Sequence, residues 1–557
     1  MTTYLSPIQM FYKWEKERPN DVFMRQPVNG KWLSYTWKEA GDQARRMATV
    51  LKNMDMPAGS RIALVSKNCA HWVLCDLAIM MAGHISVPIY PNVGGDTLNY
   101  VVTHSEAPVL FVGKLDSWKG MAGGLPAGVK VIAFPEMYGK YEFENWDTLI
   151  KDVAPLAGET LRQPDELMTI IYTSGTTGQP KGVMQTFHAL SYAVSNALAQ
   201  NNEVVRVPDP ATGRGRFFSY LPLSHIAERL LVEMGCLYSG SEMYFAESLD
   251  TFAVNLAEAR PTIFLGVPRI WSKFQSGILA KMPQKKLNLL LSIPFVSSIV
   301  KNKIKTGLGL DKANHCLSGA SPIPPSLILW FGKLGINIQE AYGMTENCAY
   351  SHINRKANNQ VGTVGQPMPL VDVKIGDNGE IWVKSEASMK GYYKNEAATA
   401  ETFTPDGYLK TGDKGEIGKQ GHLKITGRVK ELFKTEKGKY VAPAPIEMII
   451  QENADIEQSC VVGVGLPQPI ALISLQPTAV GKSRNEIKDS LSETLESVNK
   501  RLEAHERLKK LIVVKTAWTV ENNLLTPSMK IKRGPIEDLY KANYDKWYGE
   551  KDSIIWE

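Results

Sequence analysis

Short apolar runs alternate with amphipathic stretches over most of this chain. The run RIALVS at 61–66 is followed by 70–83, where apolar residues recur at helical spacing, and then by HISVPIY at 84–90. Apolar runs of about four to eight residues between turn residues indicate buried strands, and helical spacing indicates a helix. Further runs of this kind lie at 107–113, 129–134 and 262–267. Roughly the first 350 residues therefore predict an α/β fold with largely parallel sheets.

The pattern changes twice towards the C-terminus. Residues 361–428 form short alternating segments broken by glycine, proline and aspartate, which is typical of a small β subdomain. After Arg428, apolar strands at 458–465 and 470–477 and a charged helix at about 484–505 predict an α+β module of roughly 130 residues, a size that can fold alone.

The predicted fold class is α/β. We expect a large N-terminal domain over 1–427, with stacked α/β subdomains to about 350 and a β-rich subdomain over about 355–427. A hinge is predicted at 428–430 and a mobile α+β C-terminal domain at 431–557. At 557 residues the chain is long enough for roughly three or four folding units.

Composition and charge mainly exclude classes of protein. The chain is 44% hydrophobic and 22% charged, as expected for a globular protein, and a net charge of +6 over 557 residues does not indicate nucleic-acid binding. The six cysteines are scattered and form no CxxC pair, so neither a disulfide framework nor a zinc site is expected. Since no secretory signal or membrane-spanning run is recognisable, we expect a cytoplasmic protein.

The segment YTSGTTGQPKG at 172–182 is rich in glycine and hydroxyl residues. It follows an apolar run at 167–172 and precedes a helical pattern at 186–200 that Thr186 could cap, so a loop from strand to helix region is expected. Glycines, hydroxyls and the Lys181 ammonium together favour phosphate binding. The common nucleotide loop is excluded because Gly182, not Ser or Thr, follows the lysine. An ordinary mobile loop is the alternative.

This loop resembles the phosphate-binding signature of the adenylate-forming superfamily, which includes acyl-CoA ligases, luciferases and peptide-synthetase adenylation domains. Further signatures follow in the family's order: LPLSHIAER at 221–229, SGASP at 318–322, EAYGMTE at 340–346, YLKTGD at 408–413, GHLKITGRVKELFKTEKGKYVAPAPIE at 421–447 and LLTPSMKIKR at 524–533. The resemblance covers about residues 10–545. The motifs at 221–229, 421–447 and 524–533 are similar to those of long-chain fatty acyl-CoA synthetases.

The resemblance implies an ATP-dependent ligase. Such an enzyme activates a medium- to long-chain fatty acid as acyl-AMP, releases pyrophosphate and transfers the acyl group to the thiol of CoA, with ATP, CoA and Mg2+ as substrates and cofactor. Joining a carboxylate to a phosphate brings two anions together, so the chemistry requires cations and oriented donors. Another acid, aromatic or branched, or a carrier-protein acceptor is the alternative. A second alternative is a nucleotide- or lipid-binding module without catalytic activity. The presence of the full set of motif residues disfavours this alternative.

The family motifs also imply roles for individual residues. Thr345 would contact the α-phosphate, Glu346 and Thr177 would hold Mg2+, and Lys530 would bridge the attacking carboxylate and the phosphate. The ribose would be bound by Asp413. The nucleotide site would comprise Thr173, Ser174, Gly175, Thr176, Thr177, Gly178, Lys181, Gly319, Ala320, Ser321, Glu340, Ala341, Tyr342, Gly343, Thr345, Asp413, Ile425, Arg428 and Lys530.

Other implied residues serve the acid, CoA and domain motion. His225, Pro268, Gly319 and Gly343 would line the acyl pocket. His225 would also be a catalytic residue, although a lone histidine is more often structural. Lys430 would be the hinge residue about which the C-terminal domain turns between the two half-reactions. Lys434, Lys437 and Gly438 would bind CoA, with a solvated charge run as the alternative. One departure is Met529, where many relatives have glycine before the lysine.

The segment KKLNLLLSIPFVSSIVKNKIK at 285–305 is apolar in the middle and carries lysines at both ends. Such a segment could lie at a membrane interface, which would place the protein at the inner face of the membrane. The alternative is a buried helix pair with basic exits. The sequence leaves a monomer or a homodimer open.

Overall fold

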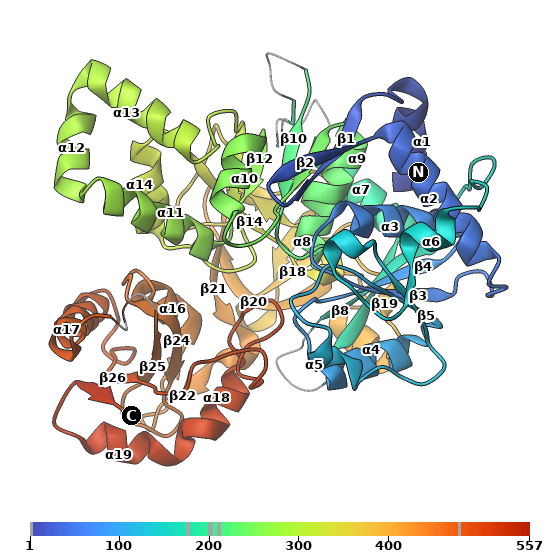
Figure 1. The fold of residues 1–557 in the computed structure, drawn as a ribbon. Coiled ribbons are helices and arrows are strands. Elements are labelled where there is room, and N and C mark those ends of the chain that lie inside the picture. Colours follow the sequence, from blue (N-terminus) through green and yellow to red (C-terminus); the bar gives the residue numbers. More distant parts are fainter. Residues whose placement is uncertain are drawn as a thin grey trace.

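The computed structural model describes residues 4–173, 179–198, 204–205, 207–208, 213–476, 479 and 481–557 (Figure 1). Two large mixed sheets with helices form the main body, and a smaller module of β-strands and helices follows at the C-terminal end. This arrangement confirms the predicted α/β fold class, with a large N-terminal part and a smaller C-terminal one.

The first large sheet contains the residues on both sides of the glycine-rich segment, Thr173 at the end of β8 and Lys181 at the start of β9. Its strand order is β19-β9-β8-β4-β3-β5-β6-β7, parallel from β8 to β7 and antiparallel at β8/β9 and β9/β19. The strands are β3 (Arg61–Val65), β4 (Ile85–Ile89), β5 (Val109–Val112), β6 (Lys130–Ala133), β7 (Glu144–Asn145), β8 (Leu167–Thr173), β9 (Lys181–Thr186) and β19 (Gly391–Tyr392). Helix α3 (Ala70–Ala82), between β3 and β4, is buried over its whole length, as its apolar sequence requires.

The second large sheet carries most of the other predicted site residues. Its order is β16-β15-β14-β13-β12-β10-β11-β1-β2, parallel from β14 to β1 with antiparallel pairs at both ends. The strands are β1 (Val22–Val28), β2 (Lys31–Thr36), β10 (Arg216–Ser219), β11 (Glu242–Phe245), β12 (Ile263–Leu265), β13 (His315–Ser318), β14 (Ile338–Tyr342), β15 (His352–Ile353) and β16 (Gln366–Pro367). Helices α1 (Pro7–Glu17) and α2 (Trp37–Lys52) begin with capping boxes at Ser6 and Thr36.

Two smaller β structures follow. The expected β-rich region is an antiparallel sheet of β17 (Asp372–Ile375), β18 (Glu380–Lys384), β20 (Leu409–Ile417) and β21 (Leu423–Arg428). The C-terminal module has a sheet of β24 (Ile456–Val462), β25 (Ile470–Leu475), β26 (Leu511–Val513) and β27 (Ile554–Trp556), with helices α16 (Pro443–Ile450), α17 (Arg484–Lys500) and α18 (Arg533–Tyr540). Helix α17 ends at Lys500 and not near 505, because the chain turns at Arg501.

The glycine-rich segment joins two strands, so the expectation of a strand-to-helix loop was wrong. Strand β9 pairs antiparallel with β8, and Thr173 lies opposite Lys181. Helix α7 (Phe187–Leu198) begins only after β9, and the Thr186 hydroxyl accepts the Ala189 backbone N–H at 3.1 Å, as its predicted capping role requires. The sequence of 181–186 contains a glycine and shows little apolar periodicity, so its pattern alone does not predict a strand.

Helices α11 (Pro268–Lys281), α12 (Gln284–Ser292) and α13 (Pro294–Gly307) project from the body beside α14 (Pro325–Lys333) (Figure 1). The alternative of a buried helix pair over 285–305 was wrong, since only Leu287 and Ser297 are buried within α12 and α13. Pro294 separates the two helices. None of the helices in the described ranges is long and apolar enough to cross a bilayer.

All six cysteines are buried and none forms a disulfide. Burial raises the pKa of every one of their thiols, so they stay protonated at neutral pH. Four of them, Cys69, Cys75, Cys236 and Cys348, pack in the largest apolar cluster of the main body. The cysteines therefore act as small core residues.

Candidate active site

Asp413 lies between a tyrosine and an arginine that the sequence also selected. Strands β20 and β21 place Asp413 directly opposite Arg428, whose Nε donates a hydrogen bond to Asp413 Oδ1 at 3.0 Å. Tyr342, at the end of β14, donates its hydroxyl to Asp413 Oδ2 at 2.6 Å. Burial and the neighbouring carboxylate raise the pKa of Tyr342 well above its usual value, so it remains a donor. Asp413 is thus held as an oriented acceptor.

Thr345 and Glu346 form a short 3-10 turn directly after β14. The Gln185 side-chain amide from β9 donates to the Thr345 carbonyl at 2.6 Å, and the Met389 backbone N–H donates to the Glu346 carbonyl at 2.7 Å. The Tyr392 hydroxyl donates to Glu346 Oε1 at 2.8 Å. Strands β9 and β19 of the first sheet therefore hold the turn that follows β14 of the second sheet.

Tyr392 also connects Glu346 to the glycine-rich segment. The Lys181 ammonium lies 4.8 Å from the centre of the Tyr392 ring, within range of a cation–π interaction. Burial raises the pKa of Glu346, while the hydrogen bond from Tyr392 and the charges of Arg428 and Lys181 oppose this shift. The carboxylate form of Glu346 therefore depends on cations in this region.

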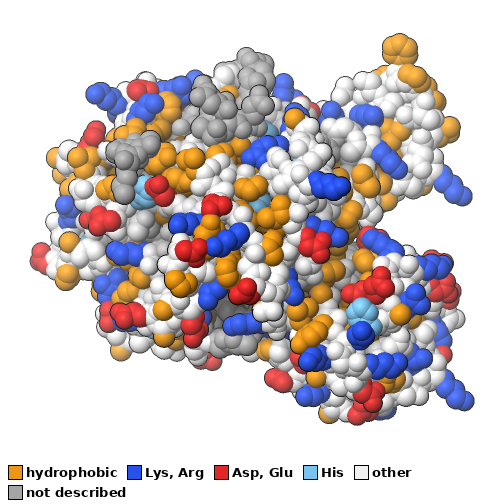
Figure 2. All heavy atoms as spheres, turned by 180° about the vertical axis from the view of Figure 1, so that it is seen from behind, with side chains coloured by type: hydrophobic (Ala, Val, Ile, Leu, Met, Phe, Trp, Pro, Cys, Tyr) orange, Lys and Arg blue, Asp and Glu red, His pale blue; other side chains and the backbone are white. Residues whose placement is uncertain are grey.

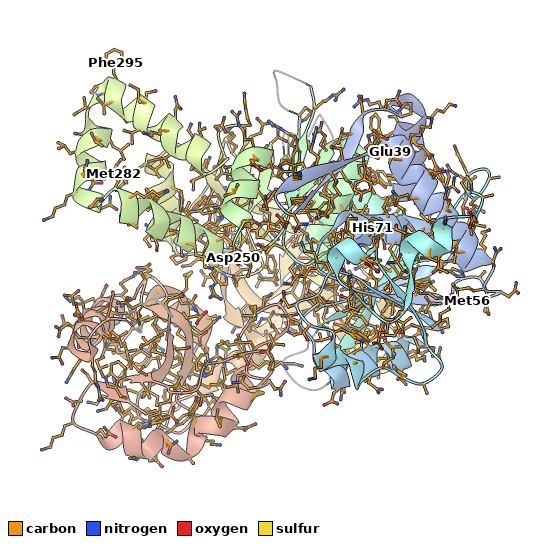
Figure 3. The ribbon with its side chains drawn as sticks, in the orientation of Figure 1. Glu39, Met56, His71, Asp250, Met282 and Phe295 are labelled. Atoms are coloured by element: carbon orange, nitrogen blue, oxygen red, sulfur yellow. The ribbon has the colours of Figure 1, made fainter. Side chains whose placement is uncertain are left out.

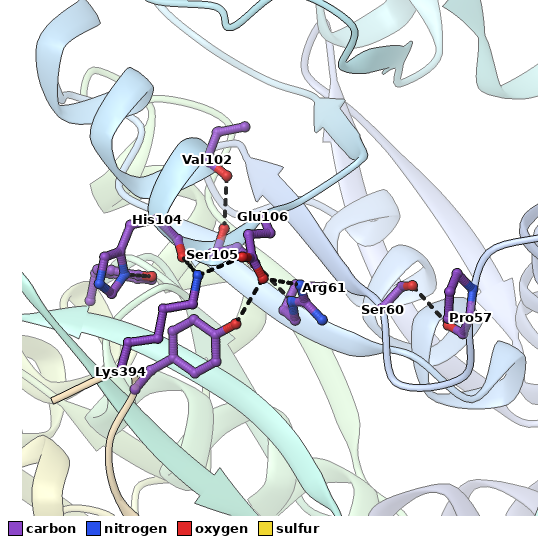
Figure 4. A network of polar contacts seen from close by, with 10 residues as sticks. Pro57, Ser60, Arg61, Val102, His104, Ser105, Glu106 and Lys394 are labelled. Carbon is purple, nitrogen blue, oxygen red and sulfur yellow. Dashed lines mark hydrogen bonds and ion pairs between the residues drawn. The ribbon is translucent and has the colours of Figure 1, made fainter. Parts of the chain in front are cut away.

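A network at the end of helix α4 (Gly95–Ser105) supports the strand that carries Tyr392. Lys394 pairs with Glu106 at 2.8 Å and donates to the His104 carbonyl at 3.1 Å, and Arg61 pairs with Glu106 at 2.7 Å (Figure 4). The neighbouring Tyr393 hydroxyl also reaches Glu106. Segment 391–394 is thus anchored to the end of α4 as well as to Glu346.

The predicted acyl-pocket residues all follow neighbouring parallel strands. His225, Pro268, Gly319 and Gly343 come after β10, β12, β13 and β14, which are adjacent in the second sheet. The carboxyl edge of a parallel sheet is the usual place for a ligand site in α/β proteins. The structure therefore places these four residues along one edge.

Close backbone packing explains the glycines at this edge. A side chain at Gly343 would come within 2.5 Å of the Ala349 backbone, and one at Gly319 within 3.0 Å of the Ala341 carbonyl oxygen. Ala320 has a φ of 66°, in the left-handed region that costs free energy for a residue with a side chain. Ser321 follows in the same turn, which lies beside Ala341.

Lys530 lies on the loop before α18 and is directed towards the main body. The Thr526 hydroxyl accepts the Lys530 backbone N–H at 3.1 Å, and the Lys530 carbonyl accepts the Thr526 backbone N–H at 2.7 Å. The Lys530 residue is exposed, yet desolvation of its ammonium lowers its pKa to about 8, with the Arg428 charge adding to the shift and Asp413 opposing it. The lysine that the resemblance selected thus lies within electrostatic reach of the Asp413 pair.

His225 is neutral near pH 7. Burial lowers its pKa to about 4, with a further contribution from the Lys530 charge. Its Nδ1 accepts the Ala227 backbone N–H at 3.2 Å and so caps the short helix Ile226–Glu228. His225 therefore has a structural role, as a helix cap. It lies on the edge where the acyl pocket is predicted.

The residues that follow His225 form a buried ion pair. Arg229 donates from Nη2 to both oxygens of Asp76 at 2.6 Å, and both side chains are completely buried. Glu233 lies 3.4 Å from Arg229 Nε, but burial and the Asp76 charge raise its pKa well above the usual range. With Glu233 protonated, the Arg229 cation is therefore balanced by one anion, Asp76. Arg229 and Glu233 lie in a π-helical segment, Arg229–Met234, and Asp76 lies on α3, so the pair joins two helical segments of the main body.

Two contacts join the C-terminal module to the main body near the site. Arg269, at the start of α11, pairs with Glu457 on β24, and the Asn92 side chain donates to the Pro527 carbonyl at 3.0 Å. The first contact lies beside the predicted acyl edge, and the second involves the loop that carries Lys530. The observed orientation of the module is thus the one that points Lys530 towards Asp413.

Some predicted residues lie apart from this group. Lys434, Lys437 and Gly438 belong to the hairpin of β22 (Phe433–Lys434) and β23 (Tyr440–Val441), and Lys430 lies exposed in the turn Val429–Glu431. Glu340 is buried with its pKa raised to about 8, so it is mainly protonated at neutral pH, and Ile425 is half-buried on β21. Ser174, Gly175, Thr176, Thr177 and Gly178 lie outside the described residues.

Sequence reasoning missed several supporting residues. Tyr392 and Gln185 contact the Thr345–Glu346 turn from 46 and 160 residues away, and no local pattern marks either of them. Asn68 was also missed: its amide bonds Ser219 at 2.7 Å and the Leu221 carbonyl at 2.6 Å, which fixes the segment before His225. Only an alignment or a structure could reveal such partners.

The donor set fits a substrate-bound Mg2+. Glu346 offers one buried carboxylate, and Mg2+ commonly binds one or two protein carboxylates together with substrate phosphates and water. Within the described ranges, no group of three or more His, Cys, Asp or Glu side chains could hold a metal by itself. A nearby cation would also favour the ionised form of Glu346 against its burial.

Known protein families and curated proteins resemble this chain over most of its length. The family described as AMP-binding enzyme matches residues 11–393, and the AMP-binding enzyme C-terminal domain matches residues 431–552. The long-chain-fatty-acid–CoA ligase FadD15 of Mycobacterium bovis is 29% identical, with 97% of each chain covered. Long chain acyl-CoA synthetase 2 of Arabidopsis thaliana is 28% identical over 98% of this chain and 92% of its own.

Solved structures show the same fold. The adenylation domain of a carboxylate reductase from Mycobacterium chelonae has a TM-score of 0.82 at 21% identity, with 98% of this chain and 91% of that chain covered. An anthranilate CoA ligase in complex with anthranoyl-AMP has a TM-score of 0.77 at 18% identity, with 97% and 98% covered.

Proposed function

Because this chain belongs to the AMP-binding enzyme family, we propose that it is an ATP-dependent long-chain fatty acid–CoA ligase. The fatty acid carboxylate attacks the α-phosphorus of ATP and pyrophosphate leaves. The CoA thiol then attacks the carbonyl of the acyl-AMP, and AMP leaves. The observation that carries this proposal is the convergence of Asp413, Arg428, Thr345, Glu346 and Lys530, from four separate motifs, around one edge of the second sheet.

Each of these residues has a role that its surroundings support. Asp413, oriented by Tyr342 and Arg428, accepts the ribose hydroxyls of the nucleotide. Lys530 brings a cation to the attacking carboxylate and the α-phosphate, where charge is redistributed in the transition state. Thr345 donates its hydroxyl to the α-phosphate.

Mg2+ bound at Glu346, together with Thr177, would supply neutralisation of the phosphate charge. Tyr392 holds the Glu346 carboxylate in place for this purpose. Lys181, at the start of β9, adds a further cation on the side of the departing pyrophosphate.

We also propose that the C-terminal module turns about Lys430 after acyl-AMP has formed. The proposed domains are 1–427 and 431–557, joined at 428–430. Turning would withdraw Lys530 and bring the hairpin with Lys434, Lys437 and Gly438 towards the phosphates of CoA. The exposed position of Lys430, between β21 and the module, supports this hinge. We place the enzyme in the cytoplasm, at the inner face of the membrane.

The test is pyrophosphate release and thioester formation with ATP, Mg2+ and CoA across carboxylic acids from acetate to oleate, with benzoate included. A maximum at medium or long chains that depends on CoA would support the ligase. Pyrophosphate release without thioester would indicate another acceptor, such as a carrier protein. No activity with any acid would contradict the proposal.

The pKa of Lys530 predicts a pH dependence of the first half-reaction. Since Lys530 must be cationic, kcat/KM for acyl-AMP formation should fall as pH rises through about 8, where the lysine loses its proton. A Lys530→Arg variant that retains activity should not show this fall, because arginine keeps its charge. Pyrophosphate release at limiting ATP would be measured between about pH 6 and about pH 10. An unchanged fall in the variant would assign the titration to another group.

A further inference from the structure

The tip formed by α12 and α13 exposes an unusual group of large apolar side chains. Phe295 is 89% exposed, the highest value among the large hydrophobic residues of the described chain, and Leu289 and Ile299 are 64% and 67% exposed. Ile293, at the junction of the two helices, is 43% exposed. Phe295 points outwards from the end of the projection, far from the C-terminal module (Figure 3). Figure 2 shows the same apolar tip standing clear of the body.

The charge around this tip has one sign. Residues 259–310 contain no aspartate or glutamate, but contain two arginines and seven lysines. Both arginines are paired, Arg260 with Asp311 and Arg269 with Glu457. In the described chain, none of the seven lysines has a carboxylate partner in an ion pair. These lysines are Lys273, Lys281, Lys285, Lys286, Lys301, Lys303 and Lys305.

Apolar and basic residues follow one another along each helix in a fixed order. On α13, Phe295, Ile299 and Lys303 are four residues apart and share a face, and on α12 Lys285 lies one turn before Leu289. The apolar side chains are therefore nearest the tip and the lysines are one turn further back. An element that inserts apolar side chains into a bilayer has this order, because its lysines then reach the lipid headgroups.

We propose that the tip of α12 and α13 docks on a bilayer surface that carries anionic lipids. Phe295, Ile293, Leu289 and Ile299 enter the acyl region, and the lysines contact the headgroups. The charge argues against a second copy of this chain as the occupant. Contact between two such tips would bring two clusters of unpaired lysines together, with no carboxylate from 259–310 to offset them.

The position of the tip relates it to the proposed function, on which this part of the inference rests. Helix α11 begins at Pro268, on the predicted acyl edge, and leads directly to α12. One apolar cluster extends from Phe264 and Trp271 near that edge to Leu287, with Leu291 and Val300 packed against it. A docked tip would hold this edge near the surface from which fatty acids are taken.

Sedimentation of the full chain with vesicles tests the docking. We expect binding to vesicles of phosphatidylcholine mixed with phosphatidylglycerol at low salt, and weaker binding at high salt or without the anionic lipid. Phe295→Ser with Ile299→Ser should reduce the partition coefficient by about tenfold or more. Lys285→Gln, Lys286→Gln and Lys303→Gln together should reduce it about a hundredfold, since each lysine near an anionic surface contributes about fivefold.

Matched controls change the same properties elsewhere. Leu161→Ser removes a side chain that is 62% exposed, and Lys16→Gln, Lys38→Gln and Lys52→Gln together remove the same charge from α1 and α2. Both controls should bind vesicles like the parent protein. All variants should retain ligase activity on detergent-dispersed fatty acid, so loss of docking is distinguishable from failure of the proposed function.

Two results would overturn the inference. One is a parent protein that stays in the supernatant at low salt, or tip variants that sediment as well as their controls. The other is a dimer, seen by light scattering, that Phe295→Ser dissociates while vesicle binding is absent. That result would make the tip an interface between two copies.

Discussion

Replacing Lys530 with alanine should lower the rate of acyl-AMP formation by about a hundredfold or more. The lysine is the cation that the C-terminal module directs towards Asp413 and Arg428, and desolvation together with the Arg428 charge lowers its pKa to about 8. Thioester formation from supplied acyl-AMP and CoA should remain close to the parent rate, because that step does not use Lys530. Pyrophosphate release and acyl-CoA formation would be measured separately.

Lys532→Ala is the matched control, since this lysine lies on the same loop and bonds the Asn523 side chain. It should leave both half-reactions largely intact. Equal loss of both half-reactions in Lys530→Ala would contradict the separate use of this residue. Equal effects of the two substitutions would point to a general disturbance of the loop.

Replacing Asp76 with alanine should destabilise the protein by about 3–5 kcal/mol, because Arg229 would be left charged and buried without its anion. Both groups have no accessible surface, and Glu233, 3.4 Å from Arg229 Nε, is itself completely buried, so its ionisation would offset only part of the loss. The free energy of unfolding would be measured by urea denaturation. Adding Arg229→Met should recover part of the loss, since the unpaired charge is then removed.

An exposed pair of the same chemistry provides the control for Asp76→Ala. Asp42 pairs with Arg46 at 2.7 Å on α2, and its side chain is 47% exposed. Asp42→Ala should therefore cost less than about 1 kcal/mol. Similar costs at the two sites would show that burial does not set the strength of the Asp76–Arg229 pair.

Patterns along the chain predicted the elements whose signals are local. The strand, helix and strand at 61–90 lie where expected, because continuous apolar runs and helical spacing leave few alternatives. Strand β9 was missed, since its pairing with β8 supplies a stability that 181–186 does not show by itself. The apolar segment at 285–305 reads the same whether its helices are buried or exposed, so only the structure could decide.

Some residues of the candidate site belong to local sequence motifs, whereas others take part only through tertiary contacts. Asp413 and Arg428 belong to quoted motifs and prove to be cross-strand partners. The contact of Tyr342 with Asp413, 71 residues apart, depends on the packing of the small sheet against β14. Tyr392 has no sequence signal, because its role follows from where β19 joins the first sheet. The roles themselves stay predictions until the variants are measured.

The burial of the six cysteines has a chemical consequence for an enzyme of this kind. An acyl adenylate is an electrophile that reacts with any accessible thiolate, including one on the protein that made it. Here every thiol is buried and kept protonated by its raised pKa. None of the six thiols is therefore available to an acyl adenylate, so the sulfur that takes the acyl group must arrive from solution.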